Sequence, residues 1–88
     1  MGDNLELEKK GMKNILVVDQ ERLGGLIVKM LQAQQLGSEL VTDGLKAITK
    51  LRTFLPDLIV ADINIPGGGL RLAELVGMNP RLQHVPII

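Results

Sequence analysis

Hydrophobic residues in this chain follow two patterns, short continuous runs and longer stretches with helical spacing. Residues 15–18 (Ile-Leu-Val-Val) and 58–61 (Leu-Ile-Val-Ala) are continuous apolar runs, and each is followed by an aspartate. A strand that is apolar on both faces is typical of a parallel sheet covered by helices on both sides. A shorter strand is predicted at 39–41. The sequence Val-Pro-Ile-Ile at 85–88 predicts the beginning of a fourth strand.

The stretches between these runs have the spacing of amphipathic helices. The first has five apolar positions three and four residues apart: Leu23, Leu26, Ile27, Met30 and Leu31. We expect this stripe to pack in the core and its helix to end at Gly37. A second helix is predicted to begin at a cap formed by Thr42 or Asp43 and to end before Pro56. A third is predicted over 70–76.

Strand and helix therefore alternate along the whole chain, which predicts an α/β fold with a parallel sheet. The 88 residues suffice for one small domain, which we assign to 13–88. Residues 1–12 are polar and contain two glycines, so we expect them to form a flexible N-terminal leader.

Composition excludes several kinds of chemistry. The chain has no cysteine, which rules out disulfides, thiolate zinc sites and cysteine nucleophiles. Ten basic and ten acidic residues give a net charge of zero, so nothing in the charge favours nucleic acid or a membrane as partner. No signal peptide or membrane-length apolar run is present, and a cytoplasmic location is expected. The lone His84 is interpreted as a surface loop residue.

The two aspartates that follow the long strands, Asp19 and Asp62, are the candidate chemistry of the chain. In an open α/β sheet, ligands bind outside the carboxyl ends of the strands. Two carboxylates brought together there repel each other unless a cation intervenes, and we expect that cation to be Mg²⁺. A carboxylate held in this way is also a possible nucleophile toward a phosphoryl group. The alternative is that each aspartate simply ends its strand and caps the next turn.

Three segments resemble a response-regulator receiver domain, the phosphoacceptor module of two-component signalling, and the resemblance extends over 13–88. The first is Ile-Leu-Val-Val-Asp-Gln-Glu-Arg at 15–22. The second and most specific is Pro-Asp-Leu-Ile-Val-Ala-Asp-Ile-Asn-Ile-Pro at 56–66, and the third is Val-Pro-Ile-Ile at 85–88. Residues 42–47 also look like the start of the family's second helix.

The resemblance implies a flavodoxin-like, doubly wound parallel sheet that is truncated soon after its fourth strand begins. Asp62 would accept a phosphoryl group from a sensor histidine kinase or a phosphotransfer protein. Mg²⁺ would be held by Asp19, Asp62, the Asn64 carbonyl and the uncharged Gln20. By this resemblance the chain is a signalling module of a phosphorelay and not an enzyme.

The chain departs from the family at three places. Gln20 stands where the family usually has a second acid, and Gly67-Gly68-Gly69 stands where an acid usually precedes a single glycine. We interpret the three glycines as a flexible loop, because they lack the spacing of a phosphate-binding motif. The chain also ends before the family's strand-end Thr or Ser and its later Lys. The alternative function is therefore a phosphorylation-independent module that self-associates through an exposed sheet edge.

Overall fold

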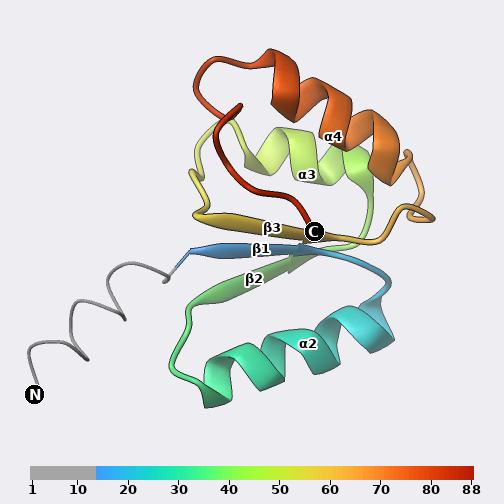
Figure 1. Cartoon of the computed structure of the whole chain (residues 1–88). Coiled ribbons are helices and arrows are strands. Elements are labelled where there is room, and N and C mark those ends of the chain that lie inside the picture. Colours follow the sequence, from blue (N-terminus) through green and yellow to red (C-terminus); the bar gives the residue numbers. More distant parts are fainter. Residues whose placement is uncertain (1–13) are drawn as a thin grey trace, which may run out of the picture.

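A computed structural model describes residues 14–88, so the leader predicted for 1–12 lies outside the described residues. Strands and helices alternate as the sequence pattern predicts (Figure 1). In chain order the elements are β1 (Ile15–Val18), α2 (Glu21–Ala33), β2 (Ser38–Val41), α3 (Gly44–Lys50), β3 (Leu58–Ala61) and α4 (Gly69–Met78). No helix in this part of the chain is long and apolar enough to cross a membrane.

The three strands form one parallel sheet in the order β2-β1-β3. In its register, Val18 is paired with Val41 on one side and with Ala61 on the other. The last residues begin a fourth row beside β3, where Ile59 N–H donates to the Pro86 carbonyl at 2.9 Å. This row amounts to a single parallel bridge between Ile59 and Ile87. The predicted parallel α/β fold is confirmed, with the fourth strand present only as this bridge.

The sheet separates two helical layers, with α3 and α4 on one face and α2 on the other (Figure 1). Alternate strand residues point to opposite faces, so Leu16, Val18 and Ile59 lie on the α3–α4 face. These three side chains are completely buried in a hydrophobic cluster that also includes residues from both helices. Apolar runs on both faces are explained by this three-layer arrangement.

Helix α2 differs from its prediction at the C-terminal end. The helix stops at Ala33, and Gln35 takes the left-handed conformation that Gly37 was expected to provide, with φ of 63°. The Leu36 N–H closes the turn on the Leu31 carbonyl at 3.0 Å. Gly37 instead belongs to the start of the sheet, where its carbonyl accepts from Ile15 N–H at 2.9 Å. The turn is therefore made earlier than the glycine indicated.

The apolar stripe of α2 is mostly not in the core, contrary to the prediction. Leu23, Leu26 and Met30 are 46%, 55% and 62% exposed. The helix instead approaches the sheet through Gly24, which is buried, and a Cβ there would collide with the Leu40 side chain. A glycine at the contact lets the helix lie close to β2, and this turns part of the apolar stripe away from the sheet.

Candidate functional site

Asp19 and Asp62 lie side by side at the carboxyl edge of the sheet. Each directly follows a strand, and the last residues of those strands, Val18 and Ala61, are register partners. The Asp62 N–H donates to the Val18 carbonyl at 2.9 Å, which extends the β1–β3 ladder to the aspartate itself. Neighbouring strands are about 4.8 Å apart, so the backbones of Asp19 and Asp62 are adjacent at this edge. The predicted juxtaposition of these two residues is present in the structure.

Asp19 is the buried member of the pair. Among the described residues it is the only polar or charged residue that is buried, with 6% of its surface exposed. Its Oδ1 accepts a hydrogen bond from the Gln20 N–H at 2.7 Å. Gln20 is the residue before α2, and its own side chain makes no capping bond to that helix. The side-chain amide of Gln20 is therefore available to the site, because it does not cap the helix.

Asp62 begins the loop that joins β3 to α4. Its Oδ1 accepts from the Asn64 N–H at 3.0 Å, which fixes the carboxylate over the first turn of the loop. Ile65 anchors the same loop by burying its side chain in the α3–α4 core. The Pro66 carbonyl accepts from the Gly44 N–H at 2.8 Å, and this bond ties the loop to the first residue of α3.

Two glycines permit a close approach of α3 and α4 to this loop. A Cβ on Gly69 would lie 2.5 Å from the Asp62 carbonyl oxygen, so only glycine fits there without a shift of the backbone. Gly67 has φ of 87° and packs against the backbone of Gly44. The interpretation of 67–69 as simply flexible overlooked these contacts. The glycine run directly after the Asp-x-x-x-Pro segment was the available signal.

A cavity of about 660 Å³ opens beside the Asp62 carboxylate. Its lining comes from the ends of all three strands and from the adjoining loops: Gln20, Glu21, Thr42, Asp43, Asp62, Asn64, Ile65 and Pro66. Asp19 is not part of the lining, because it lies buried next to Gln20. Glu21 and Asp43 add carboxylates to the cavity, whereas the site residues predicted from sequence included neither of them.

The electrostatics of the cavity favour a cation. No Lys or Arg is part of the lining, and the only ion pair in residues 14–88 joins Lys50 to Glu39, at 2.5 Å. Asp43 is partly engaged, because its Oδ1 accepts from the Lys46 N–H at 2.7 Å and caps α3. Carboxylates gathered without a basic neighbour repel one another, and a bound cation relieves that repulsion.

The donor set matches Mg²⁺ in kind, though it is sparse. It offers the Asp62 carboxylate, the Gln20 side-chain amide oxygen and backbone carbonyls in the lining, with the buried Asp19 at the end of the neighbouring strand, and all of these are hard oxygen ligands. Within residues 14–88 there is no group of three or more His, Asp or Glu side chains placed to hold a metal. Mg²⁺ is commonly bound through one or two carboxylates while it keeps several waters. The residues therefore fit a hydrated Mg²⁺ ion and not an all-protein cage.

Comparison with known proteins finds response regulators both by sequence and by fold. No family model matches the chain. The chain is 28% identical over 85 residues to the transcriptional regulatory protein BaeR of Escherichia coli. It is 31% identical over 77 residues to the phosphate regulon transcriptional regulatory protein PhoB of Rhizobium meliloti. The matches include 96% and 86% of this chain and 34% of each relative. The chain thus spans about a third of the length of the curated relatives it matches.

Solved structures give the same result. The chemotaxis response regulator CheY4 of Vibrio cholerae superposes with a TM-score of 0.82 at 27% identity, over 86% of this chain and 65% of that one. The receiver domain of the sensor histidine kinase PA1611 of Pseudomonas aeruginosa has a TM-score of 0.77 at 23% identity, over 86% and 64%. That structure has a magnesium ion coordinated in its active-site cleft.

Residues 14–88 thus have the receiver fold of response regulators, as far as the first residues of its fourth strand. The chain is also similar in sequence to regulators of that class. The resemblance noted in the three sequence segments is confirmed for the fold and the kind of module.

Proposed function

We propose that the chain is a phosphoacceptor receiver module in which Asp62 takes a phosphoryl group from a histidine kinase or a phosphotransfer protein. The observation that carries this proposal is the position of Asp62, at the end of β3, beside the buried Asp19 and facing a cavity lined without basic residues. The similarity of the chain to response regulators supports the same function. Receiver domains are signalling modules, and the role assigned to Asp62 is that of an acceptor.

The transfer is a nucleophilic substitution at phosphorus. An Asp62 carboxylate oxygen forms the new P–O bond while the P–N bond of the donor's phosphohistidine breaks. The leaving imidazole keeps the electron pair of that bond and takes up a proton, and Asp62 becomes an acyl phosphate. The Asn64 N–H holds the Asp62 carboxylate in place during the approach of the donor.

A Mg²⁺ ion would be held by Asp19, Asp62, the Asn64 carbonyl and Gln20. When bound, it supplies positive charge that offsets the repulsion between these carboxylates and an incoming phosphoryl group. The magnesium in the PA1611 receiver domain, which has the same fold, supports this assignment. Asp19, already desolvated and fixed by the Gln20 N–H, provides the inner carboxylate of the set.

Incubation with Mg²⁺ and acetyl phosphate, followed by intact-mass measurement, tests the proposed function. We expect one phosphoryl group on the native chain and none on Asp62→Asn. The matched control is Asp57→Asn, because Asp57 is an exposed aspartate at the opposite end of β3 and should not affect loading. A folded native chain that gains no phosphoryl group, or an Asp62→Asn chain that gains as much, would contradict the proposal.

The metal assignment has its own test in Gln20→Asp. An added carboxylate at this position should raise the affinity for Mg²⁺ about tenfold, equivalent to roughly 1.4 kcal/mol. Gln34→Asp, at the far end of α2, is the control for the added charge. Titration with MgCl₂, followed by NMR at the backbone amides of positions 20 and 64, measures both. Equal Mg²⁺ affinity in the two variants would show that position 20 does not face the ion.

A second proposal is self-association through the sheet edge beside β3. Residues 86–88 bond β3 through the Pro86 carbonyl and through both backbone groups of Ile88. The Ile87 N–H and carbonyl point the other way, because backbone groups alternate in direction along a parallel ladder. An edge of this kind pairs readily with a strand of another chain. The exposed side chain of Ile88 adds apolar surface there.

Sedimentation equilibrium separates this proposal from phosphoryl transfer. The native chain should be dimeric at micromolar concentrations, and Ile87→Pro should shift it toward monomer because the outward donor is lost. Leu70→Lys, an exposed position on α4, is the control and should leave the dimer intact. A monomeric native chain would refute self-association and leave the role of Asp62 unaffected.

A further inference from the structure

A second pocket lies at the opposite end of α3 and α4 from the acidic site. It has a volume of about 250 Å³ and is lined by residues of both helices and of the segments that follow them. The eight lining residues are Ile48, Leu51, Arg52, Leu75, Val76, Asn79, Arg81 and Leu82. None belongs to the cavity at Asp62. The pocket is therefore a separate feature of the α3–α4 layer.

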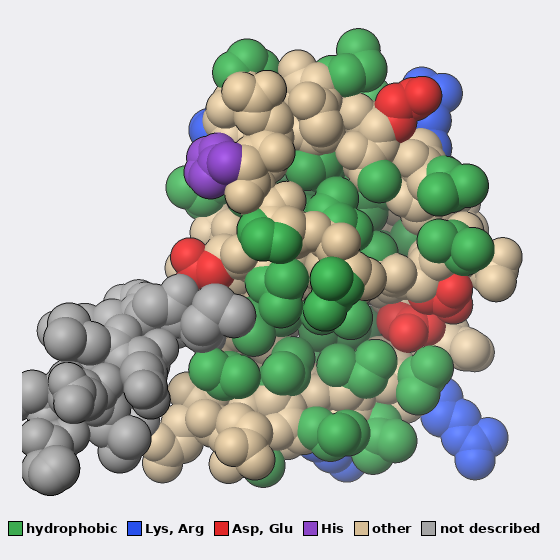
Figure 2. Space-filling view, in the orientation of Figure 1, with side chains coloured by type: hydrophobic (Ala, Val, Ile, Leu, Met, Phe, Trp, Pro, Cys, Tyr) green, Lys and Arg blue, Asp and Glu red, His purple; other side chains and the backbone are tan. Residues whose placement is uncertain are grey.

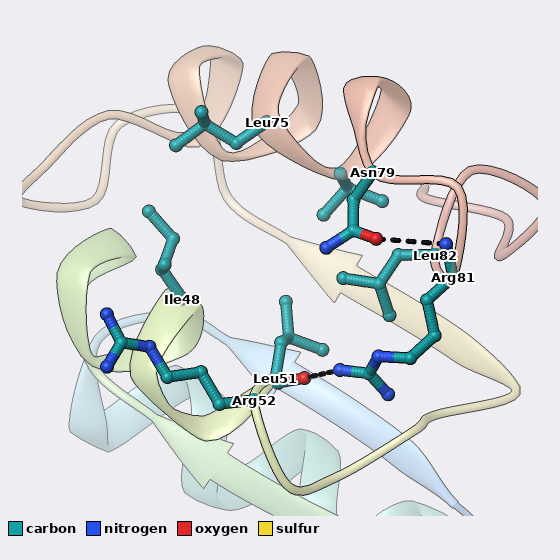
Figure 3. Close-up of a pocket in the computed structure, with 8 residues that line it drawn as sticks. Ile48, Leu51, Arg52, Leu75, Asn79, Arg81 and Leu82 are labelled. Atoms are coloured by element: carbon teal, nitrogen blue, oxygen red, sulfur yellow. Dashed lines mark hydrogen bonds between the residues drawn. The ribbon is translucent and has the colours of Figure 1, made fainter.

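The floor and the rim of this pocket differ in chemistry. Leu51, Val76 and Leu82 are buried and form an apolar floor that belongs to the main core. Arg52 and Arg81 are exposed and lie on either side of Leu51 (Figure 3). No acidic residue lines the pocket, and neither arginine forms an ion pair with any of residues 14–88. The pocket thus combines an apolar interior with a net positive rim.

The two arginines are not equivalent. Arg81 donates through one terminal nitrogen to the Leu51 carbonyl at the end of α3, and its own N–H donates to Asn79 Oδ1 at 2.9 Å (Figure 3). The bond to Leu51 connects α3 to the segment after α4. The other guanidinium donors of Arg81 remain available. The Arg52 N–H donates to the Thr49 carbonyl at 3.2 Å, but its guanidinium makes no hydrogen bond or ion pair with any of residues 14–88. Its exposed charge is therefore available to a ligand at the rim.

We propose that this pocket binds a small amphipathic carboxylate. The apolar body would lie against the apolar floor, and the carboxylate would pair with Arg52, assisted by the remaining donors of Arg81. An apolar cavity of about 150 Å³ already accepts benzene, so this larger pocket suits a chain of about six to ten carbons. The cavity is too small for a folded partner, and the positive rim selects an anion over a neutral or cationic analogue.

Titration of the ¹⁵N-labelled chain with octanoate tests the proposal. We expect saturable shifts at the amides of Leu51, Leu75 and Leu82, and no such shifts with octylammonium, which has the same apolar body and the opposite charge. Arg52→Met should weaken octanoate binding about fivefold, because an exposed charge-assisted hydrogen bond is lost. The matched control is Arg71→Met, an exposed arginine of α4 outside the pocket, which should bind octanoate as the native chain does.

Leu75→Trp supplies a second variant that does not depend on charge. The larger side chain should fill the pocket and abolish the octanoate shifts, while the spectrum of the β1 and β3 amides remains that of a folded chain. The proposal is overturned by non-saturating shifts, by equal binding of octylammonium, or by unchanged octanoate affinity in both Arg52→Met and Leu75→Trp.

Discussion

The two faces of the sheet are built from equally apolar strands but are covered very differently. On the α3–α4 face, Leu16, Val18 and Ile59 are fully buried against two helices. On the α2 face, the β3 residues Leu58 and Val60 are only half-buried, and the helix leaves leucines and a methionine exposed. Figure 2 shows hydrophobic side chains gathered across the middle of one side of the molecule, between the two helical layers.

This difference indicates that the candidate site is supported mainly by the well-covered α3–α4 face, which we call the closed face. The loop after Asp62 is fixed by Ile65 in the core, by the bond from Gly44 to Pro66, and by the close approach of Gly69. All three contacts come from the α3–α4 side. The α2 face contributes Gln20 and Glu21 to the site. It also leaves apolar side chains exposed, which favours contact with another apolar surface.

The largest expected effect comes from a matched pair of helical leucines. Leu72→Ala, in the closed face, should lower the free energy of unfolding by about 2–5 kcal/mol, because it leaves a cavity in a packed core. Leu26→Ala, in the exposed stripe of α2, should change it by less than about 0.5 kcal/mol. Urea denaturation followed by circular dichroism measures both, and equal losses would remove the distinction between the faces.

A pair of glycines in α4 gives the next effect, with opposite signs. Gly69→Ala should destabilise the chain by about 1–3 kcal/mol, because the new methyl group overlaps the Asp62 backbone. Gly77→Ala, in the same helix with no atom within 4 Å of the added Cβ, should stabilise it by up to about 1 kcal/mol. Thermal unfolding of the two variants checks the signs. Stabilisation by Gly69→Ala would mean that α4 does not press on the Asp62 loop.

The smallest effect concerns how the helices of the two faces begin. Asp43→Ala should cost about 1 kcal/mol, because the side chain caps α3 through the Lys46 N–H. Asp43→Asn keeps an accepting oxygen and should cost only a small fraction of this. At the start of α2, Gln20→Ala should have little effect on stability, since its side chain caps nothing. A loss in Gln20→Ala as large as in Asp43→Ala would contradict these assignments.

Sequence patterns were sufficient for the strands and for the pairing of Asp19 with Asp62. Continuous apolar runs reveal buried parallel strands, and parallel strands bring their carboxyl ends to one edge. The orientation of α2 was not predictable in the same way. Its apolar stripe has the spacing of a core face, yet the contact with the sheet is made by Gly24, and only the packing against Leu40 reveals this.

The surroundings of the site were harder to predict than its two aspartates. Glu21 and Asp43 reach the cavity because of how the turns after β1 and β2 bend, which residue spacing does not specify. The roles of Gly44 and Gly69 depend on contacts between segments more than twenty residues apart or across a loop. Such contacts are tertiary, and a run of glycines signals only that close approach or unusual backbone angles are possible.

The most direct test of the central claim is to locate the phosphoryl group on the native chain. After loading with Mg²⁺ and acetyl phosphate, borohydride reduction converts an aspartyl phosphate into homoserine, and peptide sequencing by mass spectrometry finds its position. We predict homoserine at position 62 and at no other aspartate. Reduction at Asp19, Asp43 or Asp57 instead, or no homoserine in a folded and Mg²⁺-loaded sample, would contradict the assignment of Asp62 as the phosphoacceptor.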